Sequence, residues 1–181
     1  MIEYIHECLR AKVCKQSCKE VSPSLGIIDS QSVKSTRSGG ICRGYDGGKR
    51  IKGKKTAYHS GYHGIILTVV VLAANIHDSQ AAMEVISCLR YRFNRMIKIV
   101  ADGGYRGELI EKLKATLNWT LEIVLRKDNN RNFKVLPKRW IVERTFSWFE
   151  SYRRLCKDFE FNTNTSEAMI QPVMIKIMLN R

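Results

Sequence analysis

The run IILTVVVLAA at residues 65–74 limits what this chain can fold into more than any other feature. Every position except Thr68 is apolar, so a strand built from this run has two apolar faces. Such a strand is typical of the centre of a sheet that is covered on both sides. The run is also far shorter than the ~20 apolar residues that a membrane-spanning helix requires. We therefore predict a buried, central strand and no contact with a membrane.

Other strand and helix patterns alternate around this run. Further strands are predicted at residues 25–33, 56–62, 98–101 and 121–125. Helices are predicted at residues 1–20, 79–93, 107–117 and 165–180, with one long helix that begins near Pro137. Residues 35–55 are rich in Gly and Lys and are expected to form a loop or a weak ribbon, and residues 126–136 a polar loop. This order predicts an α/β fold in which helices flank a mixed sheet, with residues 1–24 as a helical segment and linker and residues 25–181 as the domain.

The charge of the chain indicates its partner. Lys and Arg number 31 against 17 Asp and Glu, which gives a net charge of +14. Such an excess favours a nucleic-acid partner over a ribosomal or membrane-surface role. The first 20 residues lack the apolar core of a signal peptide, so we expect a cytosolic protein with reduced thiols. A zinc site built from His6, Cys8, Cys14 and Cys18 is the weaker alternative, since their spacing matches no standard finger.

Three acidic residues occupy positions from which they can converge. Asp29 lies in an otherwise apolar strand, and Asp102 closes the apolar strand IVAD, where open α/β sheets place ligands. Glu143 lies in the predicted long helix, about 200° around the axis from Ile141. The apolar stripe of that helix is expected to consist of Ile141, Thr145, Trp148, Tyr152, Leu155 and Phe159. Each acid alone has an ordinary explanation as a turn, cap or surface residue, but the three together indicate a site.

Three carboxylates held close together repel one another unless cations neutralise them. Oxygen ligands suit Mg²⁺ or Mn²⁺, and two such ions can promote attack on a phosphodiester. The sequence therefore predicts Asp29, Asp102 and Glu143 as ligands of two divalent ions. Basic side chains are expected to bind the DNA backbone, namely those of Lys34, Lys49, Arg50, Lys52, Lys54, Lys55, Arg139, Arg144, Arg153 and Arg154.

Five segments resemble those of one family, in the same order and at similar spacing. They are IIDSQSVK, RGYDGGKRIKGKK, VVVLAANIHDSQAA, ADGGYRG and RWIVERTFSWFESYRRLCKDFE, and together they span roughly residues 22 to 165. The chain thus resembles the insertion-sequence-five family of DDE transposases. The resemblance implies a ribonuclease-H-like fold, Asp29, Asp102 and Glu143 as the DDE triad, and cleavage and strand transfer at terminal inverted repeats and target DNA. It also implies a homodimer or higher assembly on DNA in the bacterial cytoplasm, at the nucleoid.

Two alternatives stay open from the sequence. A ribonuclease-H-like nuclease uses the same acids for hydrolysis alone, and a non-catalytic DNA-binding remnant of a truncated transposase keeps the charge without turnover. Sites for ATP or NAD are not expected, because the glycines at 39–48 fit neither a P-loop nor a dinucleotide fingerprint. Trp119, Trp140 and Trp148 are expected to be core residues rather than stacking surfaces for bases.

Overall fold

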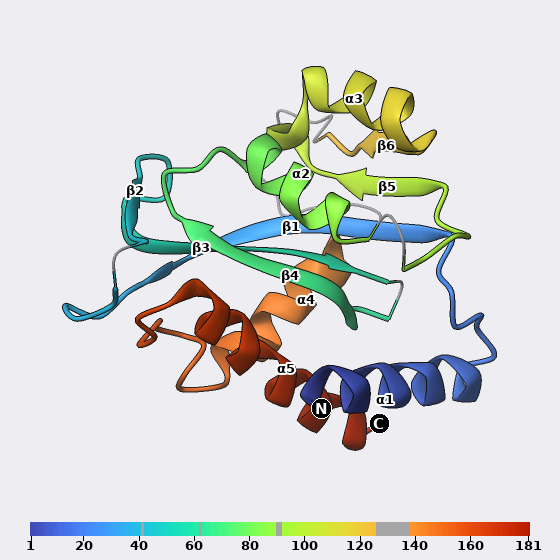
Figure 1. The fold of residues 1–181 in the computed structure, drawn as a ribbon, viewed down its shortest axis with the longest axis horizontal. Coiled ribbons are helices and arrows are strands. Elements are labelled where there is room, and N and C mark those ends of the chain that lie inside the picture. Colours follow the sequence, from blue (N-terminus) through green and yellow to red (C-terminus); the bar gives the residue numbers. More distant parts are fainter. Residues whose placement is uncertain (41, 62, 90–91, 126–137) are drawn as a thin grey trace, which may run out of the picture.

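A computed structural model describes residues 1–40, 42–61, 63–89, 92–125 and 138–181. The strands are β1 (Leu25–Lys34), β2 (Gly44–Asp46), β3 (Ile51–Ser60), β4 (Ile66–Ala73), β5 (Lys98–Ala101) and β6 (Thr120–Ile123). The helices are α1 (Ile2–Gln16), α2 (Asp78–Ser87), α3 (Glu108–Leu117), α4 (Arg139–Glu150) and α5 (Thr163–Leu179), with a short 3₁₀ turn η1 (Gly103–Tyr105). The strands form a mixed sheet with helices on both faces (Figure 1). The predicted α/β class is confirmed.

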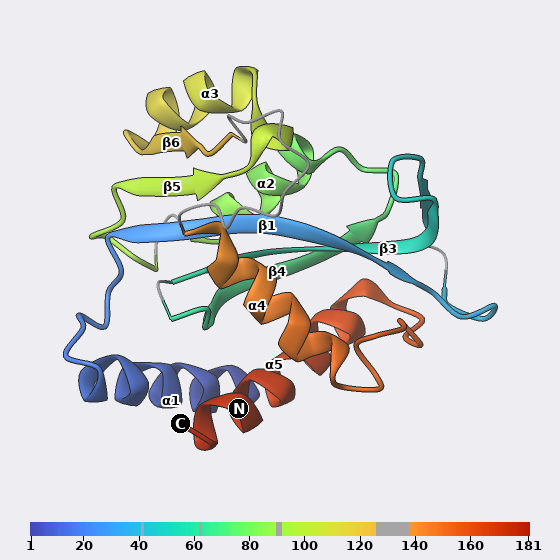
Figure 2. The same cartoon turned by 180° about the vertical axis from the view of Figure 1, so that it is seen from behind.

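The strand order defines the fold. β4, β3 and β1 are antiparallel neighbours, and β5 and β6 continue the sheet beyond β1 as parallel strands. The short β2 pairs with the first residues of β3. α2 and α3 cover one face, while α4 and α5 cover the other, as the view from behind shows (Figure 2). This is the ribonuclease-H-like mixed sheet that the sequence resemblance implies.

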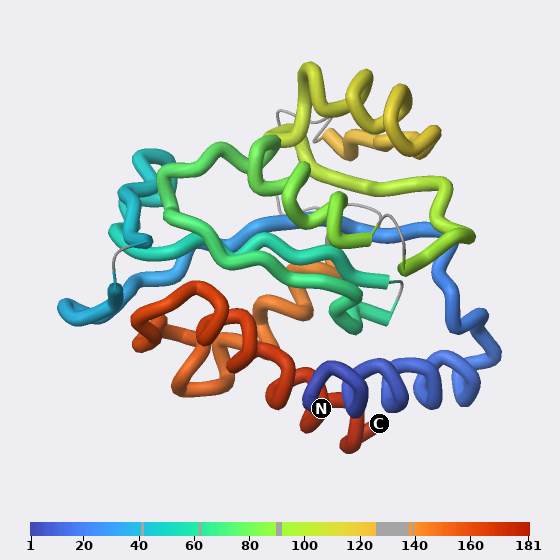
Figure 3. Tube along the Cα trace, viewed as in Figure 1, coloured from blue at the N-terminus to red at the C-terminus, as the bar shows by residue number. Residues whose placement is uncertain are grey.

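Helix α1 packs against α5, below the face that carries α4 (Figure 3). Val13 of α1 joins the core of that face, together with Ile170 and Met174 of α5. The division of the chain at residues 24 and 25 stays a prediction. Among the described residues, no helix is both long and apolar enough to span a membrane.

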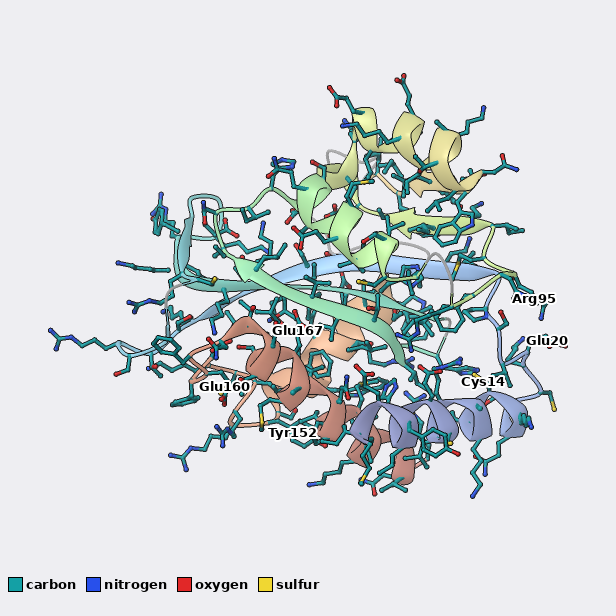
Figure 4. All side chains as sticks on the ribbon, viewed as in Figure 1. Cys14, Glu20, Arg95, Tyr152, Glu160 and Glu167 are labelled. Carbon is teal, nitrogen blue, oxygen red and sulfur yellow. The ribbon has the colours of Figure 1, made fainter. Side chains whose placement is uncertain are left out.

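The apolar run at residues 65–74 forms an edge strand, so the prediction of a central strand was wrong. Within the described part of the chain, β4 pairs with β3 alone. Both of its faces are nevertheless covered, because Leu67 packs in the core beneath α2 and α3 while Ile66 and Val71 pack beneath α4 and α5. Both faces of this strand are therefore apolar because helices cover both faces of the sheet. The pattern does not require a neighbouring strand on each edge. On the open edge, Glu167 of α5 accepts a hydrogen bond from Val71 N at 2.8 Å (Figure 4).

Most other elements agree with the predictions to within about four residues, but three differ more. The first is α2, which ends at Ser87 although the sequence predicted a helix to residue 93. The Gly- and Lys-rich stretch holds the β2–β3 ribbon, so β3 begins at Ile51 instead of Thr56. The predicted long helix ends at Glu150, because the chain turns after Ser151. Its inner face consists of Ile141, Val142, Thr145 and Phe149, whereas Phe159 is 46% exposed. The predicted polar loop at residues 126–136 and the predicted helix start at Pro137 lie outside the described residues.

A buried ion pair fixes the segment that follows α4. Lys54 of β3 is fully buried, and its ammonium donates to Asp158 Oδ1 at 3.1 Å and Glu160 O at 2.7 Å. Asp158 also accepts a hydrogen bond from the Ser166 hydroxyl at 2.7 Å, at the start of α5. Its backbone bridges to Lys34 O and Thr36 N, which extends β1. The predicted contact of Lys54 with DNA is therefore wrong, because its ammonium group is buried and paired with Asp158.

We predict that Lys54→Met lowers the free energy of unfolding by about 3–5 kcal/mol, because it leaves the Asp158 carboxylate without its cation. Denaturant unfolding measures the change. The control is Lys52→Met, an exposed position on the same strand, where the change should stay within about 0.5 kcal/mol. Equal stability of the two variants would contradict the importance of the pair.

His59 of β3 is a fully buried histidine. Both ring nitrogens lie inside the protein and bond to none of the described residues. The ring packs against Gly26, where an added Cβ would lie 1.7 Å from a ring carbon. Burial lowers the pKa of His59 to about 3, from an ordinary value of 6.5. Between about pH 6.5 and pH 3, the His59 ring is therefore neutral in the folded protein but protonated in the unfolded chain.

We predict that His59 makes stability fall as pH drops from 6.5 towards 3. Over this range the unfolded state binds more protons than the folded state, and the loss approaches about 1.4 kcal/mol per pH unit. Urea unfolding between pH 7 and 4.5 should show that the free energy of unfolding falls less steeply in His59→Leu than in the parent protein. His77→Asn is the control, since it removes an exposed imidazole and keeps a side chain that can cap α2. The same slope in His59→Leu and the parent would refute the assignment.

Candidate active site

Two of the three predicted acids lie side by side. β1 and β5 are parallel, and Ile27 pairs with Val100. Asp29 and Asp102 each follow this pair by two residues, so they stand level and on the same face of the sheet. Both line a small hollow with Val142 of α4. The hollow therefore lies where β1, β5 and α4 meet.

Each aspartate is held by the backbone that follows it. Asp29 Oδ1 accepts a hydrogen bond from Ser30 N at 2.7 Å. Asp102 caps η1, and its Oδ1 accepts from Gly104 N at 2.9 Å. A Cβ at Gly104 would stand 3.1 Å from that same oxygen, which explains why a residue without a side chain follows so closely. Both carboxylates therefore have defined positions.

Helix α4 is anchored over this face by contacts from β3. The Tyr58 hydroxyl donates to Val142 O at 2.8 Å, and its ring packs edge-on against Phe146 and Phe149. Burial raises the pKa of Tyr58 well above 10, and the nearby Asp29 carboxylate raises it further. Further along the helix, Gln31 of β1 donates to Glu150 at 2.8 Å. These contacts fix the part of α4 that carries Glu143.

Glu143 follows Val142 directly on α4, and its side chain is exposed. Among the residues that the structure describes, no three Asp, Glu, His or Cys side chains lie close enough to hold a metal ion. The structure therefore brings Asp29 and Asp102 together but does not gather all three acids into one ligand set. Two adjacent carboxylates are the hard oxygen donors that Mg²⁺ or Mn²⁺ prefers, so this pair fits a divalent ion.

A fourth carboxylate lies next to this pair, and sequence reasoning missed it. Asp78 begins α2, and its Oδ1 accepts from Ser30 Oγ and from Lys55 Nζ, each at 2.7 Å. Burial acts to raise the pKa of Asp78, but the bonds from Lys55 and Ser30 outweigh it and hold the pKa below its ordinary value. The segment NIHDSQ contained the signal, but its Asp was interpreted only as a helix start. Lys55 is buried and also donates to Ile76 O, so its predicted contact with DNA is wrong.

Comparison with known proteins identifies the family. The model of the family described as the transposase DDE domain matches residues 20–175. The chain belongs to this family. Members are polynucleotidyl transferases of the transposase and integrase type, and DDE transposases use divalent metal ions. A search of the curated proteins found no match.

Solved structures similar to this DDE domain include an integrase and a transposase. The catalytic core domain of BIV integrase is 14% identical, with a TM-score of 0.46 over 84% of this chain and 82% of that one. The catalytic domain of Mos1 mariner transposase is 8% identical, with a TM-score of 0.49 over 98% of this chain and 86% of that one. A Mos1 mariner paired-end complex with Mn is 10% identical, with a TM-score of 0.45 over 96% and 57% of the two chains.

The exposed cations of the predicted set lie on the β2–β3 ribbon, at the end of β1 and beyond α4. Lys49, Arg50 and Lys52 are exposed on the ribbon, and Lys49 Nζ reaches Ser30 O at 3.2 Å. Arg153 and Arg154 are exposed beyond α4, where Arg154 pairs with Glu160. The other exposed cation of the predicted set is Lys34, at the end of β1. The side chain of Arg139 lies outside what the structure describes.

Arg144 of the DDE domain stacks between two tryptophans on the outer side of α4. Its guanidinium lies 4.6 Å from the centre of the Trp140 ring and 4.9 Å from that of Trp148. It also donates to His63 O at 3.1 Å. Trp119 is buried as predicted, but Trp140 is 41% exposed, so its assignment to the core was wrong. The stack ties α4 to the turn before β4, which leaves Arg144 partly occupied by internal contacts.

Proposed function

We propose that this DDE domain is the catalytic core of a transposase of the insertion-sequence-five type, which cleaves and joins DNA at the ends of its element. The observation that carries the proposal is the juxtaposition of Asp29, within β1, and Asp102, just after the parallel strand β5, in a hollow beside α4. Family membership supplies the reaction class. The five sequence segments supply the narrower family.

Asp29 and Asp102 would hold the metal, and Glu143 would complete the ligand set from α4. Two bound ions would activate the attacking oxygen and stabilise the leaving oxygen of a phosphodiester. The protein's own part is to hold the carboxylates at fixed spacing. Tyr58 and Gln31 support this arrangement because they fix the height and tilt of α4 over β1. Glu143 is exposed on this anchored helix, one residue beyond the hollow, so a rotation of its side chain is the movement that we propose.

DNA would lie along the exposed cations on the same side of the molecule. The β2–β3 ribbon carries Lys49, Arg50 and Lys52, and the segment after α4 carries Arg153 and Arg154. Phosphate contacts of this kind position a duplex without reading its sequence. We propose the terminal inverted repeats and the target DNA as the duplexes, bound by two or more copies of the chain.

We predict that Asp29→Asn, Asp102→Asn and Glu143→Gln each reduce DNA cleavage below about one hundredth of the parental rate, because metal ions contribute several kcal/mol to such transition states. The assay is cleavage and joining of a labelled duplex that carries the ends of the source element, with Mg²⁺ or Mn²⁺ and with EDTA. Glu108→Gln is the matched control, since this exposed carboxylate lies on α3 and pairs with Lys112.

Parental cleavage in any of the three acid variants would remove that residue from the proposed site. Hydrolysis without joining would favour the nuclease alternative. DNA binding without any product would favour the non-catalytic remnant. If a variant still binds DNA, its loss of cleavage reflects a defect in catalysis and not in DNA binding.

We predict that Arg50→Gln and Lys52→Gln weaken DNA binding and reduce the slope of log K against log salt by about 0.9 for each phosphate that the variant no longer neutralises. Fluorescence anisotropy at several salt concentrations measures this slope. Lys49 is left intact because its ammonium contacts the backbone next to Asp29. Lys114→Gln, an exposed cation on α3, is the control and should leave the slope unchanged. An unchanged slope in both ribbon variants would place the DNA elsewhere.

A further inference from the structure

Asp29 and Asp102 are held by two separate backbone arms. The first arm is Ser30, whose N–H bonds to Asp29 Oδ1. The second arm is Gly104, whose N–H bonds to Asp102 Oδ1. The spacing of the two carboxylates therefore depends on whatever fixes these two arms relative to each other.

Asp78 bonds to the first arm and lies close to the second. Its Oδ1 accepts the Ser30 hydroxyl at 2.7 Å, so it fixes the side chain of the first arm. Its Oδ2 lies 3.2 Å from the point where a Cβ of Gly104 would stand, and Asp102 Oδ1 lies 3.1 Å from that point on the second arm. Asp78 thus lies between the arms that carry the two catalytic aspartates.

Lys55 locks Asp78 in this position. Its buried ammonium lies 2.7 Å from Asp78 Oδ1 and 2.6 Å from Ile76 O, just before α2. The pair has no net charge. The effect of Asp78 on the site is therefore mainly geometric, because Lys55 cancels much of its field.

The hydroxyl of Tyr105 supports the same arrangement. Tyr105 follows Gly104, is 1% exposed, and its hydroxyl bonds to none of the described residues. Burial raises its pKa well above 10, and the charges of Asp29, Asp78 and Asp102 raise it further. The neighbouring Ser30 hydroxyl lowers the pKa of Tyr105 in turn, which places this hydroxyl beside the first arm.

We propose that Asp78 is a positioning residue of the active site, which sets the spacing of Asp29 and Asp102 because it bonds Ser30 and limits the space beside Gly104. This inference rests on the proposed function, because it assumes that those two aspartates bind a divalent ion. Groups that hold metal-binding carboxylates commonly change metal affinity 10- to 100-fold when they are removed.

The test is the affinity of the full chain for Mn²⁺ without DNA, measured from the electron paramagnetic resonance signal of the free ion. Asp78→Ala should weaken binding about 10- to 100-fold. The double variant Asp78→Asn with Lys55→Met removes both charges but keeps a side chain of the same shape against Ser30 and Gly104, so it should retain most of the affinity. Asp46→Ala is the matched control: it breaks the similar Ser32–Asp46 pair and touches neither arm. Circular dichroism shows which variants fold, and Ser30→Ala replaces Asp78→Ala if that variant does not.

The outcomes separate this inference from the function on which it rests. If the wild type binds Mn²⁺ and Asp78→Ala binds it equally well, the positioning role is refuted and the proposed function stands. If the double variant loses as much affinity as Asp78→Ala, charge and not position is what Asp78 supplies, and the inference fails. If the wild type binds no better than the combined Asp29→Asn and Asp102→Asn variant, the proposed metal site fails, and this inference fails with it.

Discussion

The rest of the structure depends on the buried pair of Lys54 and Asp158. The two residues are far apart in the chain, and their contact closes the C-terminal third of the molecule onto β3. Asp158 also receives bonds from Ser166, at the start of α5, so one carboxylate fixes the path between α4 and α5. A charge with no access to water requires such partners. The segment after α4 must therefore turn where it does, and α4 cannot continue as a long helix.

The placement of α4 in turn determines what the active site can do. The aspartates belong to the sheet, where strand pairing sets their register, but Glu143 belongs to a helix that only side-chain contacts align with the sheet. Two of the acids are thus positioned by the backbone and the third by packing. This division agrees with an ordered pair of aspartates beside a glutamate whose side chain is exposed.

The sequence was sufficient to predict the fold class, because hydrophobic periodicity locates strands. The closeness of Asp29 and Asp102 was predicted from their positions on two strands and from the family resemblance, and the register of β1 and β5 agrees with it. It was insufficient where a residue's role depends on contacts distant in the chain. In the sequence, Lys54 and Lys55 cannot be distinguished from their exposed neighbour Lys52. Only the tertiary structure shows that they are buried, paired with Asp158 and Asp78 respectively. Likewise, the apolar run at residues 65–74 indicates that both faces of its strand are covered, but it does not indicate whether both edges of that strand are paired.

The contact between Glu167 and the open edge of β4 has a consequence for assembly. An edge strand is a template onto which the sheet of another molecule can extend, and natural proteins prevent this by placing charged groups against the edge. Glu167 occupies one outward-facing N–H of β4 from a helix that already packs on that strand. Pairing of a strand from another molecule with this part of the edge would require α5 to move away from β4.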